Sequence, residues 1–137
     1  MAAGDLTVTA ASVRPVGHCI IGRFTAGATL TPGQPVYISA NDTVALSGGA
    51  NVTLGACIGL VISDSTGASS FASGTEVDVV MRGHVTGFTA NVSANSAAFV
   101  SDVAGVMNTT KGTKVCRVGI GKNASTLYVN PMLLDSA

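Results

Sequence analysis

Glu76-Val-Asp-Val-Val-Met81 alternates charged and apolar residues, and Gly83-His84-Val85 continues the same stretch. Alternation with a period of two places successive side chains on opposite faces of a β-strand. The pattern predicts that the alternate valines face a core, while Glu76 and Asp78 form an outward, solvated face. Paired carboxylates can also bind a metal or perform acid–base chemistry, but the solvated face is the simpler interpretation.

Short apolar runs and glycines on either side of this stretch extend the β pattern. Ile58-Gly-Leu-Val-Ile62 is a continuous apolar run, which predicts a strand buried on both faces. Gly33-Gln-Pro-Val36, Gly74-Thr-Glu-Val77 and Gly112-Thr-Lys-Val115 each place a turn glycine three residues before a strand valine. This regularity predicts repeated turns and strands around a closed sheet, which removes exposed edges. The best helix candidate, 96–107, is rich in valine, so we expect little helix.

The composition indicates a surface that associates with other molecules. The chain has 137 residues, the size of one domain, and only 10% of them are charged, compared with about 25% in a typical soluble domain. Hydrophobic residues make up 47%, yet no run of about 20 apolar residues predicts a membrane span. A weakly charged surface favours contacts between subunits. A monomer that is simply uncharged is the alternative.

The charges and the first residues argue against several partners. Seven basic and seven acidic residues cancel, and the basic ones are mostly scattered, so we expect no nucleic-acid partner. The densest basic run, Lys111 to Lys122, is interpreted as one solvated strand face. Met1-Ala-Ala-Gly-Asp5 has neither a basic nor an apolar segment, so we expect no secretory signal and no membrane partner.

Residues that could perform catalysis or bind metals are few and widely separated. The chain contains two histidines, His18 and His84, and three cysteines, Cys19, Cys57 and Cys116, without metal-ligand spacing. We therefore expect small buried thiols in a reducing compartment. A Cys57–His84 pair could meet in space, but no local motif supports it. We predict no enzyme, no catalytic residues, no metal site and no cofactor.

The N-terminal segment is distinct from the rest. Asp5 to Val13 alternates weakly, and Arg14-Pro15 ends this extended piece, because the residue before proline avoids the helical region. We predict an extended N-terminal arm over 1–13 and a single β-barrel domain over 14–137. The fold class is therefore all-β, a small closed or sandwich-like β-barrel with an extended N-terminal arm and little helix.

Four segments together carry a resemblance to a known family. They are Val13-Arg14-Pro15, Gly27 to Ile38, Ile58 to Ile62 and Ala72 to Val85. Their turn-and-strand pattern resembles the small β-barrel decoration, or cement, proteins of tailed-bacteriophage heads. The resemblance covers roughly residues 5 to 90.

This resemblance implies a structural virion protein, made in the host cytoplasm and bound to the outer capsid surface. It implies a homotrimer at threefold or quasi-threefold positions of an icosahedral shell, where it clamps neighbouring capsomers. The arm would add a strand to the major capsid protein. The capsid-contact residues of the arm would be Leu6, Thr7, Val8, Thr9 and Arg14.

Two other functions are alternatives. The first is a fibre-head or receptor-contacting β domain on a virion, which would use exposed loops such as Ser63 to Ser73. That loop is small and polar, which argues mildly against recognition. The second, a small β-barrel hydrolase, lacks a glycine-rich motif paired with a catalytic Asp.

Overall fold

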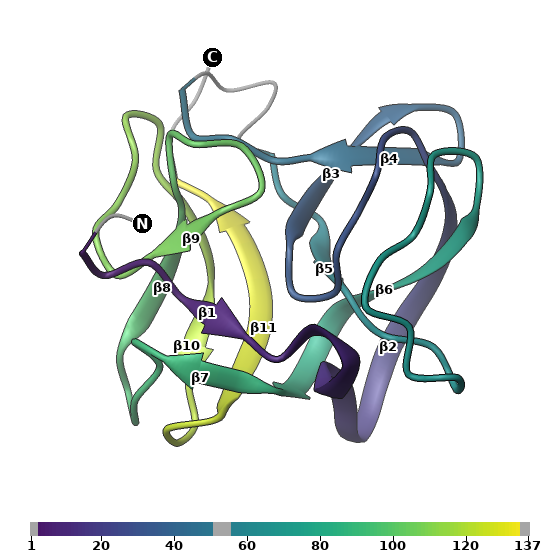
Figure 1. Cartoon of the computed structure of the whole chain (residues 1–137). Coiled ribbons are helices and arrows are strands. Elements are labelled where there is room, and N and C mark those ends of the chain that lie inside the picture. Colours follow the sequence, from purple (N-terminus) through teal and green to yellow (C-terminus); the bar gives the residue numbers. More distant parts are fainter. Residues whose placement is uncertain (1–2, 51–55, 135–137) are drawn as a thin grey trace.

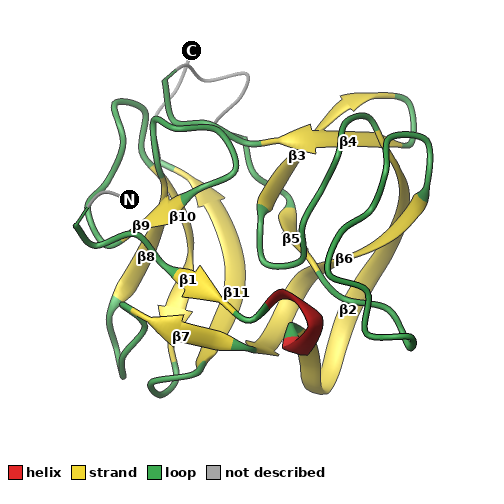
Figure 2. Ribbon diagram, viewed as in Figure 1, coloured by secondary structure: helices red, strands yellow, loops and turns green. Residues whose placement is uncertain are grey.

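The computed structural model describes residues 3–50 and 56–134, and these residues form an almost entirely β structure (Figure 1). The one helical element among these residues is a short 3-10 turn, Ala10–Ser12, drawn in red in Figure 2. The strands are β1 (Thr7–Val8), β2 (Arg14–Ala26), β3 (Pro35–Ala40), β4 (Thr43–Leu46), β5 (Gly59–Val61), β6 (Glu76–Thr86), β7 (Phe88–Ala90), β8 (Ala97–Val100), β9 (Met107–Asn108), β10 (Cys116–Gly121) and β11 (Thr126–Leu133). The all-β, sandwich-like prediction is confirmed.

β6 separates two hydrophobic cores. Val77 and Val79 pack in the second core, whereas Val80 and Val85 pack in the first core. The first core consists of Val13, Cys57, Leu60, Ile62, Val80, Val85, Phe88, Val92, Ala98, Val100, Met107, Cys116, Val118, Leu127 and Val129. The second core consists of Ala26, Leu30, Val36, Val44, Val61, Phe71, Val77 and Val79. The predicted inward direction of the alternate valines is therefore confirmed, and the adjacent Val80 is buried on the opposite face.

The same two-sided burial holds for β5. Leu60 and Ile62 face the first core, and Val61 faces the second. This confirms the prediction that the run from Ile58 to Ile62 is buried on both faces. In Figure 1, β7 to β11 lie on the left and β3 to β5 on the right, and β6 runs from the right-hand side to the lower middle, where it meets β7.

The strand pairings explain how each core is enclosed. The nine-stranded sheet has the order β2-β4-β3-β5-β6-β11-β10-β8-β9, and β2 also pairs with β6. β2, β4, β3, β5 and β6 therefore form a closed circuit of pairings around the second core. The first core lies against β6, β11, β10 and β8. A sheet of nine strands twists strongly, and a twisted sheet can fold back on itself in this way.

At Gly83 the alternation of β6 changes, because Val80 before it and Val85 after it both face the first core although they are an odd number of residues apart. Gly83 has a φ of +132°, and an added Cβ would lie 2.9 Å from the Cβ of Cys19 on β2. Opposite this point, the register of β2 against β6 shifts between Val16 and Ile20, so residues 17–19 bulge out. Only glycine satisfies both the backbone angle and the close approach of β2.

The predicted turn glycines are partly confirmed. Gly33 and Gly74 have φ values of +94° and +89°, as the pattern predicts. Gly112 is different, because its φ is not positive and an added Cβ would lie 2.8 Å from the carbonyl oxygen of Val100. Glycine is required there for the close approach of two loops. The segment 96–107 contains β8 and no helix among the described residues, in agreement with the expectation of little helix.

The interpretation of Lys111 to Lys122 as one solvated strand face is wrong. β10 begins only at Cys116, so Lys111 and Lys114 lie in the preceding loop. Lys122 lies in the turn between β10 and β11, and only Arg117 is on the strand, half-buried. Basic residues spaced along a loop, a strand and a turn share no face.

Among residues 3–50 and 56–134, no helix has the length and apolar character needed to cross a bilayer.

Candidate interaction surface

The first described residues pair with the edge of β9. The Leu6 N–H donates to the Met107 carbonyl oxygen at 2.9 Å, and the Thr109 N–H donates to the Gly4 carbonyl oxygen at 3.1 Å. Asp5 and Asn108 form an antiparallel bridge between these two bonds. The edge of the nine-stranded sheet is therefore covered by the chain's own N-terminal segment.

The next residues cover a second edge. In β1, Thr7 pairs with Ala90 and Val8 with Phe88, so β1 lies antiparallel to β7. The hydroxyl groups of Thr7 and Thr89 are 2.8 Å apart. The backbone groups predicted to extend a capsid sheet thus pair with β7 in the single chain, and Val8 also packs against the first core.

The predicted arm continues along the body of the protein. The Thr9 N–H donates to the Gly87 carbonyl oxygen at 2.9 Å, and the Val13 side chain is fully buried, with 0% exposed. Arg14 begins β2, and its Nη1 donates to the Asp64 carbonyl oxygen at 3.2 Å. The structure thus brings Leu6, Thr7, Val8, Thr9 and Arg14 together as one segment lying on its own domain. Their contact with a capsid stays a prediction.

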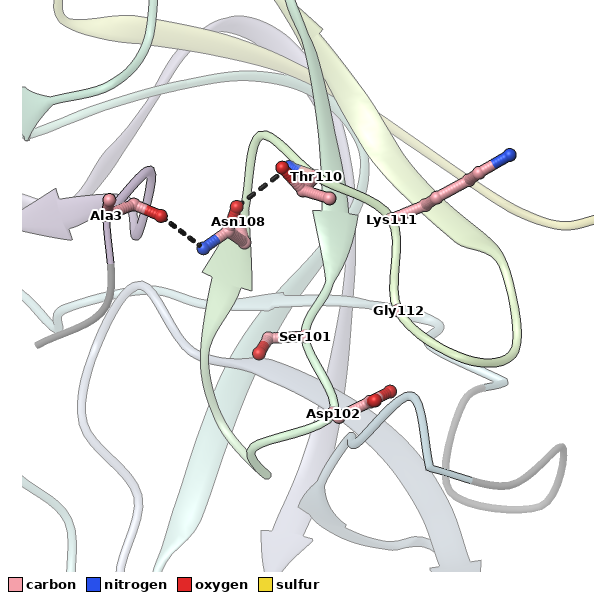
Figure 3. A pocket seen from close by; sticks show the side chains of 7 residues that line it. All are labelled: Ala3, Ser101, Asp102, Asn108, Thr110, Lys111 and Gly112. Carbon is pink, nitrogen blue, oxygen red and sulfur yellow. Dashed lines mark hydrogen bonds between the residues drawn. The ribbon is translucent and has the colours of Figure 1, made fainter.

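A polar hollow of about 220 Å³ opens beside this segment (Figure 3). It is lined by Ala3, Ser101, Asp102, Asn108, Thr110, Lys111 and Gly112. The Asn108 Nδ2 donates to the Ala3 carbonyl oxygen at 3.1 Å and to the Asp5 Oδ1 at 2.7 Å, while its Oδ1 accepts the Thr110 N–H at 2.8 Å. Both ends of this amide therefore hold backbone segments together.

The Asp102 carboxylate, which lines the hollow, also holds backbone in place. Asp102 accepts the Thr113 N–H at 2.7 Å and the Thr113 hydroxyl at 2.6 Å. These bonds hold the pKa of Asp102 below its usual value, with the Thr113 hydroxyl the largest cause. The Lys111 side chain points away from Asp102 (Figure 3). The hydrogen bonds of Asp102 join the loop after β8 to the loop before β10.

The residues considered for catalysis are separated in the structure. The Cys57 thiol donates to the Gly59 carbonyl oxygen at 3.3 Å, while the His84 ring lies against Tyr128 with 5.2 Å between centroids. Glu76 pairs with Arg23 at 2.6 Å on the surface. Within the described part of the chain, no three His, Cys, Asp or Glu residues gather closely enough to hold a metal ion.

The buried thiols predict a specific pH dependence. Burial raises the pKa of Cys57 from 9.0 to about 12, and the nearby Cys116 adds to the effect. Above pH 9 the unfolded thiol ionises while the folded thiol stays neutral. The stability contributed by Cys57 is therefore complete below about pH 9 and is lost between pH 9 and about 12.

We expect urea unfolding to show a loss of about 1.4 kcal/mol per pH unit in this window, relative to a Cys57→Ala variant. The variant has no thiol at position 57, so the pH dependence of its free energy of unfolding comes from the other titrating groups alone. Parallel pH profiles for the two proteins would contradict the assignment.

Several aliphatic side chains remain exposed on the surface. On β2, the exposed fractions are 39% for Val16, 54% for Ile20 and 44% for Ile21. The end of β11 exposes Met132 and Leu133, and Leu134, the next residue, is also exposed. With only 10% charged residues in the chain, these side chains form apolar areas that are not balanced by charge.

Comparison with known proteins gives no family. No family model matches the chain, and no curated protein matches it. Function is therefore inferred from the surface and from the pattern of the sequence.

The exposure of the aliphatic residues Val16, Ile20 and Ile21 on β2 was not predicted from the sequence. Ile20 and Ile21 stand in a run from His18 to Phe24 that reads as an ordinary strand. Adjacent apolar residues on one strand must face opposite sides, so at least one side needed a second core or a partner. That signal was present, but only the structure shows that both side chains are largely exposed.

Proposed function

We propose that this chain is a structural assembly protein that binds copies of itself and the outer surface of an icosahedral phage head. The observation that carries the proposal is the set of exposed aliphatic residues on β2 within a nearly uncharged chain. Burial of apolar surface supplies most of the free energy of protein association. The resemblance to decoration proteins supplies the identity of the larger partner and implies a trimer.

The mechanism is clamping by many weak contacts. A protein that bridges neighbouring capsomers raises the free energy needed to separate them. Each contact can be modest, because repeated copies multiply the strength of attachment. The first and second cores share β5 and β6, so the two parts of the protein are joined by strands that are buried on both faces.

The fibre-head alternative receives little support from the loop that would serve it. Asp64 is the acidic side chain of the loop 63–73, and its Oδ1 accepts the Thr66 N–H at 3.0 Å and the Ala68 N–H at 3.1 Å. The Thr66 hydroxyl also donates to the Asp64 Oδ1, and this bond, together with the backbone bonds, lowers the pKa of Asp64, with the hydroxyl the largest cause. A carboxylate that orders its own loop is less able to bind a receptor group. For the hydrolase alternative, no three His, Cys, Asp or Glu residues of the described part of the chain lie close enough to hold a metal ion.

The test is to express the chain together with the major capsid protein encoded in the same genome and to image the assembled shells. We expect regular extra density on the outer surface at symmetry positions, and co-sedimentation of the chain with the shells. A chain that stays in the supernatant while shells assemble normally would overturn the proposal.

A further inference from the structure

One side of β2 presents unpaired backbone groups. β2 pairs with β6 along most of its length, but with β4 only at Thr25 and Ala26. The Thr25 N–H points toward β4, since it donates to the Asp42 carbonyl oxygen at 2.7 Å. Backbone groups of alternate residues point the same way in a strand, so those of Arg23 and Ile21 also point away from β6.

The hydrogen bonds of β6 also indicate that the backbone groups of Arg23 point away from β6. Arg23 is opposite Asp78 on β6, and the Asp78 carbonyl oxygen accepts the Ile62 N–H at 3.1 Å, on the side away from β2. Arg23 and Asp78 are therefore a non-hydrogen-bonded pair, as the direction of the Thr25 bond requires. Within residues 3–50 and 56–134, no strand or loop pairs with the outward backbone groups of Ile21 and Arg23.

Three other strand edges carry protection that this one lacks. Residues 4–6 cover β9, and β1 covers β7. The end of β11 beyond its pairing with β6 contains Pro131, which cannot donate a hydrogen bond. On β2 the register against β6 shifts around residues 17–19 and again between Ile20 and Ile21, where Met81 of β6 has no partner, and it is regular from Ile21 to Thr25. The segment Ile20 to Phe24 is left as an open edge with no proline and one charge, and such an edge is a template for strand pairing.

We propose that Ile20 to Phe24 pairs antiparallel with the same segment of a second copy, about a twofold axis through Gly22. In that register Ile21 lies opposite Arg23 of the second copy, and both residues direct their backbone groups toward the partner strand. Each pair exchanges N–H···O=C bonds in both directions. Gly22 faces Gly22 of the second copy at the non-hydrogen-bonded position on the axis, where the two strands approach most closely.

The side chains agree with this register. Ile20 lies opposite Phe24 of the second copy, and Phe24 lines an open hollow of about 240 Å³ with Arg23, Thr25, Asp42 and Glu76. The hollow offers space for the isoleucine, which is 54% exposed in the single chain. Arg23 faces Ile21 rather than another Arg23, so no like charges are directly opposite, and its aliphatic stem covers the isoleucine.

A second copy is the occupant that the charges favour. The formal net charge of the chain is zero, so two copies do not repel each other as they approach. A twofold contact also needs only one self-complementary segment. The inference rests on the proposed self-association but not on the phage shell, and a threefold assembly would use another surface, such as the exposed end of β11.

The test compares two lysine substitutions by sedimentation velocity over a range of concentrations. Ile21→Lys places an ammonium group opposite Arg23 of the second copy, so we expect dimer dissociation to increase about tenfold or more. Val103→Lys is the matched control, since Val103 is 64% exposed and lies in the loop between β8 and β9. Both variants should keep the wild-type thermal midpoint, because neither side chain is in a core.

Amide hydrogen exchange provides a second measurement. The amides of Ile21 and Arg23 should become protected as the protein concentration rises, and Ile21→Lys should remove that protection. A wild-type protein that is monomeric at all concentrations overturns the inference, and so does an oligomer, including a trimer, that Ile21→Lys leaves unchanged. The second result would leave the proposed function standing, whereas loss of shell binding with an intact β2 dimer would contradict only the proposed function.

Discussion

Removal of residues 1–13 should abolish cooperative folding of the remaining chain, rather than produce a stable domain without its arm. Deletion of this segment removes Val13 from the first core and uncovers the edges of β9 and β7 at the same time. Burial of one valine side chain contributes about 1.5–3 kcal/mol. Leu6 and Val8 also pack against the first core, so their loss adds to this figure.

The total approaches the stability of a whole domain, which is about 5–15 kcal/mol. Exposed strand edges also favour aggregation, so the truncated protein should accumulate as insoluble material. The measurement is urea unfolding followed by circular dichroism on whatever fraction is soluble. A truncated protein with the wild-type midpoint would show that the segment is an independent arm, as the sequence alone predicts.

A point substitution separates the core contribution from the loss of the edges. Val13→Ala should lower the free energy of unfolding by about 2 kcal/mol, because Val13 is fully buried. Val103→Ala removes the same atoms from a side chain that is 64% exposed, and it should change stability by less than about 0.5 kcal/mol. Equal effects of the two substitutions would contradict the placement of Val13 in the first core.

Gly59→Ala should destabilise the protein by about 3 kcal/mol or more. An added Cβ at Gly59 would collide with the backbone carbonyl of Val80, on the strand that separates the two cores. A backbone oxygen cannot rotate aside as a flexible side chain can, so β5 and β6 would have to separate. Thermal unfolding measured by calorimetry should show the loss directly.

The matched control is Gly48→Ala. Gly48 is also buried, but an added Cβ there would lie 3.4 Å from the nearest atom, the Cα of Ala104, which is an ordinary contact. We expect a change of less than about 1 kcal/mol. If both substitutions are tolerated equally, the close packing of β5 on β6 is contradicted.

The strands with the clearest patterns could be predicted from the sequence. The alternation from Glu76 to Met81 indicated which side chains are buried, and the run from Ile58 to Ile62 indicated burial on both faces. These patterns are local, because strand geometry alone decides which neighbours share a face. The sequence could not show that the two faces of β6 belong to different cores, since that depends on strands far along the chain.

The N-terminal segment illustrates the limit most clearly. Leu6 to Thr9 has the alternation of an extended strand, and the structure contains a strand there. A strand's backbone groups are the same in every sequence, so nothing in Thr7 or Val8 specifies β7 as the partner rather than another molecule. The pairing depends on tertiary packing, because Val13 is buried in the first core and Leu6 and Val8 pack against it, which holds the segment against the body.

The amino-acid sequence by itself determined the β character of this protein, its low charge and the burial of its most regular strands. These properties follow from the composition and from the alternation of side chains along a strand, which has a period of two residues and depends only on local geometry. Only the tertiary structure decided which strand edges are covered and which are open. Hydrogen bonds between strands join residues as far apart as Asp5 and Asn108, and their partners are chosen by the packing of the whole chain.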